Sequence, residues 1–221
     1  ERLSEETGGA KRSYDQPSKG ILWGWEVSAY IWTKGIAAGT YMVAALAMLS
    51  GFAEMSDGLW SMTLGVSIFF LAITGILLVI DLDRPERFLY VMLRPNWDSW
   101  LVKGAYILSG FGGILALSAG VIILDLDRSL LTYLAIAGVP LALLTGVYTA
   151  WLLMQAKGRS WSEDSLLPAK FLVETVAIGA AVFFPLSLME PLSFAIGGVV
   201  LLGILAHDNK LVMKPQMEPL L

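Results

Sequence analysis

Residues 59–80 read LWSMTLGVSIFFLAITGILLVI, a stretch of 22 residues without a charged side chain. A helix needs about 20 mostly apolar residues to cross a bilayer, so this stretch predicts a membrane-spanning helix. The whole composition agrees, because 56% of the 221 residues are hydrophobic and only 15% are charged, whereas about 25% are charged in soluble domains. A soluble globule of this size could not bury that much apolar surface, and the soluble class is excluded.

Six apolar spans are visible, and together they predict an all-α, polytopic transmembrane helix bundle. They run over residues 28–52, 59–80, 101–124, 130–153, 168–189 and 191–206. The last span is short and follows a turn at Glu190. We therefore expect a polar N-terminal arm over residues 1–20, a first four-helix bundle over 21–154, and a partial second bundle of two helices with a C-terminal tail over 155–221.

The distribution of basic residues predicts the orientation in the membrane. If the six spans alternate in direction, thirteen of the 15 Lys and Arg residues fall on the same side of the membrane as the N-terminus. They are Arg2, Lys11, Arg12, Lys19, Arg84, Arg87, Arg94, Lys103, Lys157, Arg159, Lys170, Lys210 and Lys214. Arg128 lies on the other side, and Lys34 lies within the first span. Because positively charged loops near helix ends are retained in the cytoplasm, the N-terminus and the loops at 81–100 and 154–167 are expected there.

The tryptophans are distributed just as unevenly. Seven of the eight fall toward that same face, namely Trp23, Trp25, Trp32, Trp97, Trp100, Trp151 and Trp161. Aromatic belts normally form at both membrane interfaces. The imbalance therefore indicates a lined cavity or a docking surface at this end of the bundle.

Composition also excludes several kinds of redox and binding site. The chain has no cysteine, so it offers no disulfide and no thiolate ligand for an iron–sulfur cluster. A single histidine, His207, cannot supply the paired imidazoles of an intramembrane haem, and no metal site is expected. The net charge of -4 gives no reason to expect nucleic-acid binding.

The first span carries two patterns. Gly35 and Gly39 form a GxxxG spacing, which predicts close packing against another helix. Glu26, Tyr30 and Lys34 follow one another at intervals of four and therefore form a stripe along one helix face. Lys34 is interpreted in two ways: it is paired or functional inside the bundle, or it snorkels to the interface.

Glu174 lies about two turns beyond Pro168, roughly 9 Å into the fifth span. A carboxylate at that depth is expected to face the bundle and to be protonated or paired, because an unpaired anion is costly in hydrocarbon. Lys34 is the only intramembrane cation available as its partner. A structural pair and a proton-handling role both remain open.

Two segments resemble a known family, the membrane subunits of the polysulfide reductase NrfD/PsrC type. Residues 23–41, WGWEVSAYIWTKGIAAGTY, are similar to the family's aromatic-rich first helix. Residues 81–108, DLDRPERFLYVMLRPNWDSWLVKGAYIL, resemble its "DLGRPERF … RPNW.SW" signature, with Asp83 in place of the glycine. Weaker likeness at 144–146, Trp161 and 167–171 extends the resemblance over about residues 23–185.

The resemblance implies a fold and a function. Such subunits have eight or more helices, contain no haem or iron–sulfur cluster, and bind quinone (menaquinone or ubiquinone). They serve molybdopterin oxidoreductases in prokaryotic cytoplasmic membranes. The chain is thus expected to exchange electrons between the quinone pool and a docked ferredoxin-like iron–sulfur subunit, on the cytoplasmic face by the charge count. It would be a non-autonomous part of a quinol/quinone oxidoreductase, with any further helix pair absent or outside this sequence.

The resemblance also implies a set of site residues. The catalytic residues carried over are Glu26 and Asp81, the quinone-binding residues are Tyr30, Lys34, Arg84 and Arg87, and the proton path comprises Glu174 and Lys34. Glu26 stands where family members often have histidine. Arg84 either holds a ring oxygen or stabilises Asp81.

Two further functions compete with quinone chemistry. In the first, Glu26, Lys34 and Glu174 form a proton or ion path of a translocating subunit. In the second, the chain is a passive anchor that only packs against partners and lipid, for which the GxxxG patch would suffice.

Overall fold

The structure is a computed structural model that describes residues 23–80, 93–156 and 159–217. These residues form six long helices and a short 3₁₀ turn, η4 (Ser160–Ser162), and no strand. The helices are α2 (Trp25–Leu49), α3 (Asp57–Ile80), α5 (Trp100–Ile123), α6 (Ser129–Met154), α7 (Leu167–Leu188) and α8 (Pro191–Met217). All except α2 are long and apolar enough to cross a membrane. The prediction of an all-α polytopic bundle is confirmed.

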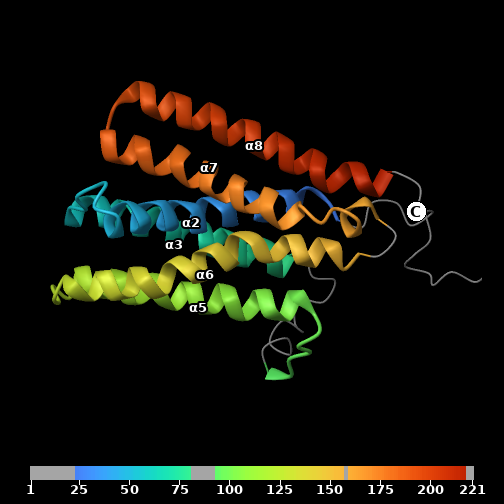
Figure 1. The fold of residues 1–221 in the computed structure, drawn as a ribbon, viewed down its shortest axis with the longest axis horizontal. Coiled ribbons are helices and arrows are strands. Elements are labelled where there is room, and N and C mark those ends of the chain that lie inside the picture. The colour runs from blue at the N-terminus through green and yellow to red at the C-terminus, as the bar shows by residue number, and fades with distance from the viewer. Residues whose placement is uncertain (1–22, 81–92, 157–158, 218–221) are drawn as a thin grey trace, which may run out of the picture.

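Helix α2 is the centre of the bundle (Figure 1). It packs against α3, α6, α7 and α8, while α5 packs against α6 and α3 on one side. Of its 25 residues, 17 are buried. Its neighbours shield α2 from lipid, which explains why it tolerates Lys34, a charged side chain that is costly to expose to hydrocarbon.

The GxxxG motif packs α2 directly on α7, as predicted. A Cβ atom at Gly39 would collide with the carbonyl oxygen of Thr175 and would come within 2.8 Å of the Gly179 nitrogen. A Cβ atom at Gly179 would in turn strike the Gly39 carbonyl. At Gly35 the facing group is the side chain of Ile178. Glycine is thus required where the two backbones touch.

Three helix ends adopt left-handed backbone conformations that reverse the chain. Gly51 (φ 72°) follows α2, Asp125 (φ 51°) follows α5, and Met189 (φ 54°) follows α7. Left-handed residues are the usual device for ending a helix, and Pro191 then suits the first position of α8. The short connections make α2 and α3, α5 and α6, and α7 and α8 antiparallel pairs (Figure 1).

Helix α8 is longer than the sequence predicts. The sequence predicts that the last span ends at residue 206, whereas α8 continues to Met217. Asp208, Val212 and Gln216 are buried at intervals of four, so they share one face that packs against the rest of the bundle. The Gln216 amide also donates to the Trp23 carbonyl and accepts from the Trp23 nitrogen, both at 2.9 Å.

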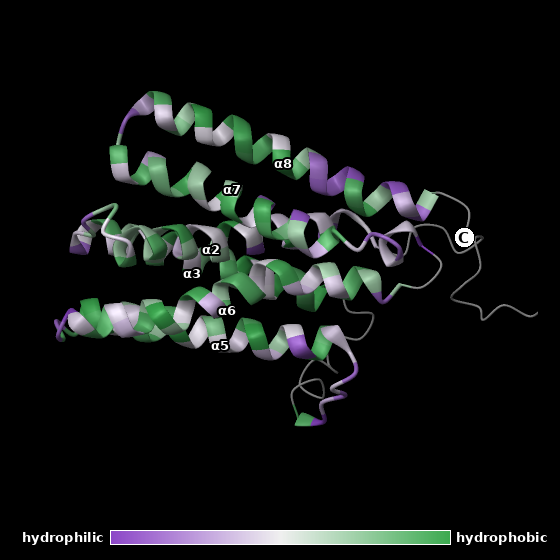
Figure 2. Cartoon of the chain, in the orientation of Figure 1, coloured by the Kyte–Doolittle hydropathy of each residue, from purple (hydrophilic) through white to green (hydrophobic). Residues whose placement is uncertain are grey.

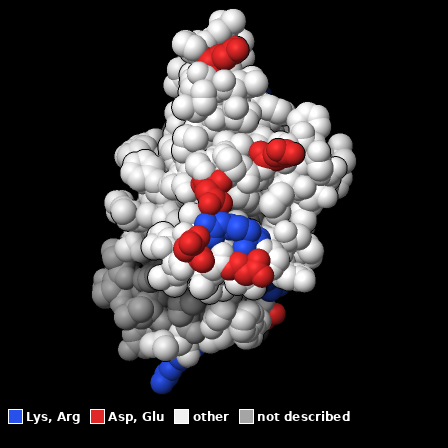
Figure 3. All heavy atoms as spheres, turned by 90° about the vertical axis from the view of Figure 1, so that its left-hand side faces the viewer, with Lys and Arg blue, Asp and Glu red and all other residues white. Residues whose placement is uncertain are grey.

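The two ends of the bundle differ in charge. Of the Lys and Arg residues within 23–80, 93–156 and 159–217, all except Lys34 and Arg128 lie at the end where α2 begins. The polar end of α8 is visible there in Figure 2. Figure 3 shows the opposite end, where basic atoms lie among acidic groups. Arg128 contacts Asp57 at 2.9 Å and Asp125 at 3.0 Å, which ties the α5–α6 connection to the start of α3.

Candidate functional site

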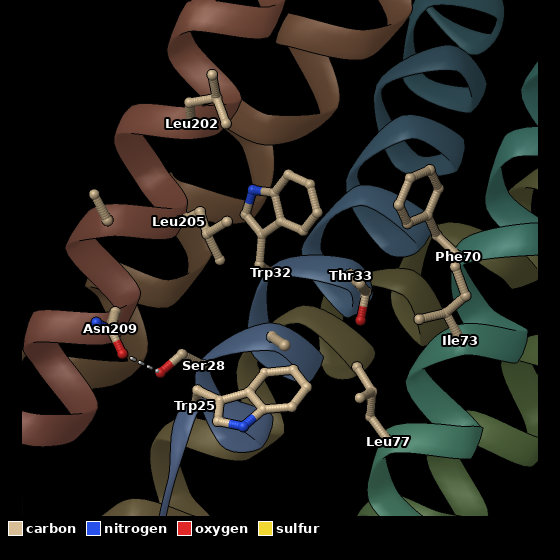
Figure 4. Close-up of a pocket in the computed structure, with 12 residues that line it drawn as sticks. Trp25, Ser28, Trp32, Thr33, Phe70, Ile73, Leu77, Leu202, Leu205 and Asn209 are labelled. Atoms are coloured by element: carbon tan, nitrogen blue, oxygen red, sulfur yellow. Dashed lines mark hydrogen bonds between the residues drawn. The ribbon is translucent and has the colours of Figure 1, made fainter.

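A groove of about 680 Å³ opens between α2, α3 and α8 (Figure 4). Most of its walls are apolar or aromatic. It is lined by Trp25, Ser28, Ala29, Trp32, Thr33, Phe70, Ile73, Leu77, Leu202, Leu205, Ala206 and Asn209. The α2 residues recur at intervals of three and four, so one face of the central helix forms the floor of the groove.

Trp32 is held at the middle of the groove. Its indole N–H donates to the Leu201 carbonyl of α8 at 2.9 Å. Its ring meets Phe70 of α3 edge to face, with ring centroids 6.1 Å apart and an interplanar angle of 88°. These contacts from two different helices fix the indole in place, and they make a rigid aromatic wall.

A separate cavity adjoins the groove on the side nearer the acidic end of the bundle. This second cavity, of about 290 Å³, shares Trp32 and Phe70 with the first and is lined further by Pro185, Phe194 and Leu201, among others. From Asn209 to Phe194 the path follows α8 for 15 residues, or about 22 Å at 1.5 Å per residue. The two adjoining cavities lie along the same stretch of α8, and both have mostly apolar walls.

Polar groups gather at one end of this path. Ser28 donates to the Asn209 side-chain oxygen at 3.4 Å, as the dashed line in Figure 4 shows. The Thr33 hydroxyl lies 2.9 Å from that of Thr74. The residues that line the deeper cavity carry a single polar side-chain group, the Trp32 N–H, which is already bonded. An amphipathic ligand would thus place its polar head at the Asn209 end.

A charged cluster lies beside the groove, on another face of α2. It consists of Lys34, Glu174 of α7 and Asp208 of α8, which interact electrostatically. Lys34 and Asp208 are 1% and 0% exposed, and Glu174 is half-buried. The cluster places three ionisable side chains from three helices inside the membrane-spanning bundle.

The Lys34 ammonium has specific neighbours on α6 and α7. It donates a hydrogen bond to the Thr149 hydroxyl, and it lies 4.4 Å from the centroid of the Tyr148 ring and 5.8 Å from that of Phe171. The hydroxyl oxygen and the ring faces both favour a cation. Lys34 is buried inside the bundle and does not snorkel, and its hydrogen-bond partner is a hydroxyl, because no carboxylate among the described residues forms an ion pair with it.

Asp208 is the member of the cluster that the sequence did not reveal. The apolar stretch ends before it, and a polar run of His207, Asp208, Asn209 and Lys210 resembles the end of a span. The available signal was the four-residue spacing of Asp208, Val212 and Gln216, which indicates that the helix continues with one buried face.

The predicted site residues that the structure describes lie in three different places. Lys34 and Glu174 come together in the charged cluster. Tyr30 is buried against Trp161 and Phe171 in an apolar cluster and does not line the groove. Glu26, half-buried in the first turn of α2, turns its carboxyl back toward Gly24.

The signature loop falls outside the described residues, so the positions of Asp81, Arg84 and Arg87 are not given by this structure. Chain continuity still relates the loop to the groove. Leu77 lines the polar half of the groove one turn before Ile80, the last residue of α3, and Asp81 follows directly in sequence.

The clustering of tryptophans at one end now has a structural description. Trp25 and Trp32 line the groove. Trp100 and Trp151 stack with ring centroids 4.7 Å apart, and Trp97 packs on Tyr106 at 4.9 Å. The expected cavity is therefore present at this end, and the remaining aromatic pairs lie outside it.

Comparison with known proteins gives the same family as the motifs. The family model described as "Polysulphide reductase, NrfD" matches residues 15–191. The chain is 28% identical over 187 residues to "Protein NrfD" of Escherichia coli (strain K12). The matched region covers 73% of this chain and 58% of that protein. The chain thus spans less than two thirds of the length of this relative. Because the family model covers most of the sequence and the fold is a bundle of membrane-spanning helices, the chain belongs to the NrfD family and is an integral membrane protein.

Proposed function

We propose that the chain is the quinone-reactive membrane subunit of a multi-subunit oxidoreductase. It exchanges electrons between the quinone pool and a docked iron–sulfur subunit. The observation that carries this proposal is the groove between α2, α3 and α8, which is long, apolar and polar at one end only. A quinone has the same distribution, with two ring oxygens at the head of an apolar polyprenyl tail.

The residues of the groove suit both parts of such a molecule. The ring lies at the end flanked by Trp25 and Trp32, where aromatic faces stack on it. The tail follows Phe70 and Phe194 toward the acidic end of the bundle. Since the groove opens between α3 and α8, the ligand enters laterally from the lipid.

Hydrogen-bonding groups at the head of the groove orient the ring. Asn209, Ser28 and Thr33 provide donors and acceptors there. Asp81, Arg84 and Arg87 follow the last residue of α3 in the sequence, and they and Glu26 remain the proposed partners of the ring oxygens. A quinol supplies two electrons and two protons when oxidised, so this chain must hold the ring and accept protons.

The same end of the molecule is the proposed docking surface for the partner subunits. The ferredoxin-like iron–sulfur subunit docks at the end where α2 begins, close to the proposed ring, because electrons must pass between the two. A molybdopterin catalytic subunit completes the complex. This end carries most of the described basic residues, so it faces the cytoplasm of a prokaryotic cell.

A second function, proton or ion translocation, is favoured by the charged cluster. Ionisable groups in membrane helices commonly mark proton pathways. Lys34 and Glu174 are the proposed proton path, and they can serve quinol oxidation or a separate translocation step.

A bulky substitution in the groove tests quinone binding. We expect Ala206→Trp, at the polar half of the groove, to lower quinol oxidation by the reconstituted complex at least tenfold while assembly is preserved. Val199→Trp is the matched control, since Val199 lies on the same helix, is 72% exposed and does not line the groove. An assembled Ala206→Trp complex with the wild-type rate would refute this site, and a complex that needs no quinone for turnover would favour the passive anchor.

A further inference from the structure

The charged cluster contains two carboxyls and one possible cation, so its charges do not balance when all three groups are ionised. Lys34, Glu174 and Asp208 interact electrostatically, yet no carboxylate oxygen among the described residues lies within 4.0 Å of the Lys34 nitrogen as an ion pair. With all three ionised, the cluster would hold a net negative charge between α2, α7 and α8. A net charge in such a low-dielectric interior is strongly disfavoured.

Asp208 is the carboxyl whose surroundings favour a bound proton, which would remove the excess negative charge. Its side chain is 0% exposed, and neither carboxyl oxygen has a hydrogen-bond partner of ordinary geometry among the described residues. The carboxyl of Glu174 lies beside it. Two adjacent carboxylates have only acceptors to offer each other, but a proton on either one supplies a donor and removes the excess charge.

The other side chains around the cluster do not supply that proton. Lys34 already donates to Thr149, and the Tyr148 ring presents its face to the ammonium. On α8 itself, His207 and Lys210 are exposed and do not share the buried face of Asp208. If Lys34 is an ammonium, one carboxyl must be protonated for neutrality, and if Lys34 is neutral, both must be.

We propose that the charged cluster is a proton-binding site, in which Asp208 and Glu174 share one exchangeable proton and Lys34 is the counter-ion. The inference deepens the proposed proton path, on which it rests, and it is independent of the quinone site because it concerns the resting protein and requires no quinone. It assigns Asp208 a role that no motif indicates, and it makes the site a place where a proton is stored inside the bundle.

Glu174 is the point of exchange with water. It is half-buried, whereas Asp208 and Lys34 are enclosed. Lys170 lies one turn earlier on α7, about 6 Å nearer the helix start, and binds Asp164 at 2.5 Å. The Lys170 ammonium holds the pKa of Asp164 below its ordinary range, so this pair marks the hydrated boundary next to Glu174.

Infrared spectroscopy of the full chain in lipid nanodiscs at neutral pH tests the proposal, because a protonated carboxyl has its own C=O stretching band that shifts in D₂O. We expect this band in the wild type. It should disappear in Asp208→Asn and in Glu174→Gln, since the remaining carboxylate then balances Lys34. In Lys34→Met it should grow about twofold, since both carboxyls then become protonated.

Glu190→Gln is the control, because Glu190 is exposed at the α7–α8 turn and should leave the band unchanged. A wild-type spectrum without the band overturns the proposal, and so does a band that survives in both carboxyl variants. If Asp208→Asn does not fold, Glu174→Gln and Lys34→Met still decide the matter. No quinone takes part in this test, so its failure leaves the proposed quinone site untouched and counts only against the proton path.

Discussion

Lys34 shows how a charged residue is kept inside a membrane protein. Because α2 is surrounded by α3, α6, α7 and α8, the Lys34 side chain has no direct path to the interface. Its ammonium instead finds a hydroxyl and an aromatic face on α6. Its charge is balanced from two other helices, so the stability of the bundle depends on the total charge of the cluster and not on one ion pair.

This balance predicts an unusual pattern of stability. We expect Asp208→Asn and Glu174→Gln to cost about 1 kcal/mol each, because either carboxylate alone balances Lys34. The double variant should cost about 3 kcal/mol or more, because it leaves an uncompensated buried cation. Thermal unfolding of the purified chain measures these differences.

Removing the cation provides the control for the same cycle. Adding Lys34→Met to the double variant makes the cluster neutral, and most of the lost stability should return. If the double variant costs only the sum of the two single variants, the carboxyls do not share a counter-ion.

At the scale of the elements, α2 and α7 meet backbone to backbone at one glycine on each helix. Gly39 and Gly179 each face the backbone of the other helix. The side chains around this crossing hold Glu174 and Lys34 at the same level of the bundle. A change in the distance between α2 and α7 should therefore alter the geometry of the charged cluster as well as the packing of the two helices.

Substitution of the crossing glycine tests this dependence. We expect Gly39→Ala to destabilise the bundle by about 1–3 kcal/mol, because the added methyl group meets backbone atoms that cannot rotate away. Gly203→Ala is the matched control, since a Cβ atom at Gly203 meets nothing within 4 Å. Equal unfolding temperatures for the two variants would show that α2 and α7 are not packed this closely.

At the scale of the whole molecule, the two ends of the bundle are chemically different. The end where α2 begins carries most of the described basic residues, the polar end of the groove and most of the tryptophans. At the opposite end Arg128 is engaged by Asp57 and Asp125. This difference in charge is the basis of the proposed orientation in the membrane, in which the proposed quinone ring lies on the basic side.

Topology reporters check this orientation. We expect a reporter inserted within residues 159–165 to indicate the cytoplasm and one inserted within 50–56 to indicate the other compartment, because basic loops are retained. The two insertions control each other, since both fall in connections between described helices. Reversed signals would place the iron–sulfur partner outside the cytoplasm and would leave the groove unaffected.

The sequence by itself determined the features that depend on neighbouring residues along the chain. Hydropathy over about 20 residues is a local property, so all six helices could be predicted, and the GxxxG spacing predicted the contact of α2 with another helix. The motifs at 23–41 and 81–108 likewise indicated the family that the comparison confirms.

Only the tertiary structure decided which face of each helix meets which neighbour. Successive residues of a helix point about 100° apart, so Tyr30 enters the apolar cluster while Trp32, two positions later, lines the groove. In the sequence, the polar end of α8 resembles an exposed tail. In the folded chain α8 packs against α2 and α7, and this packing buries Asp208. Burial is a property of the assembled helices. For that reason the sequence indicated a cavity or docking surface at this end without its walls, and the partners of the buried Asp208 face were decided only by the tertiary structure.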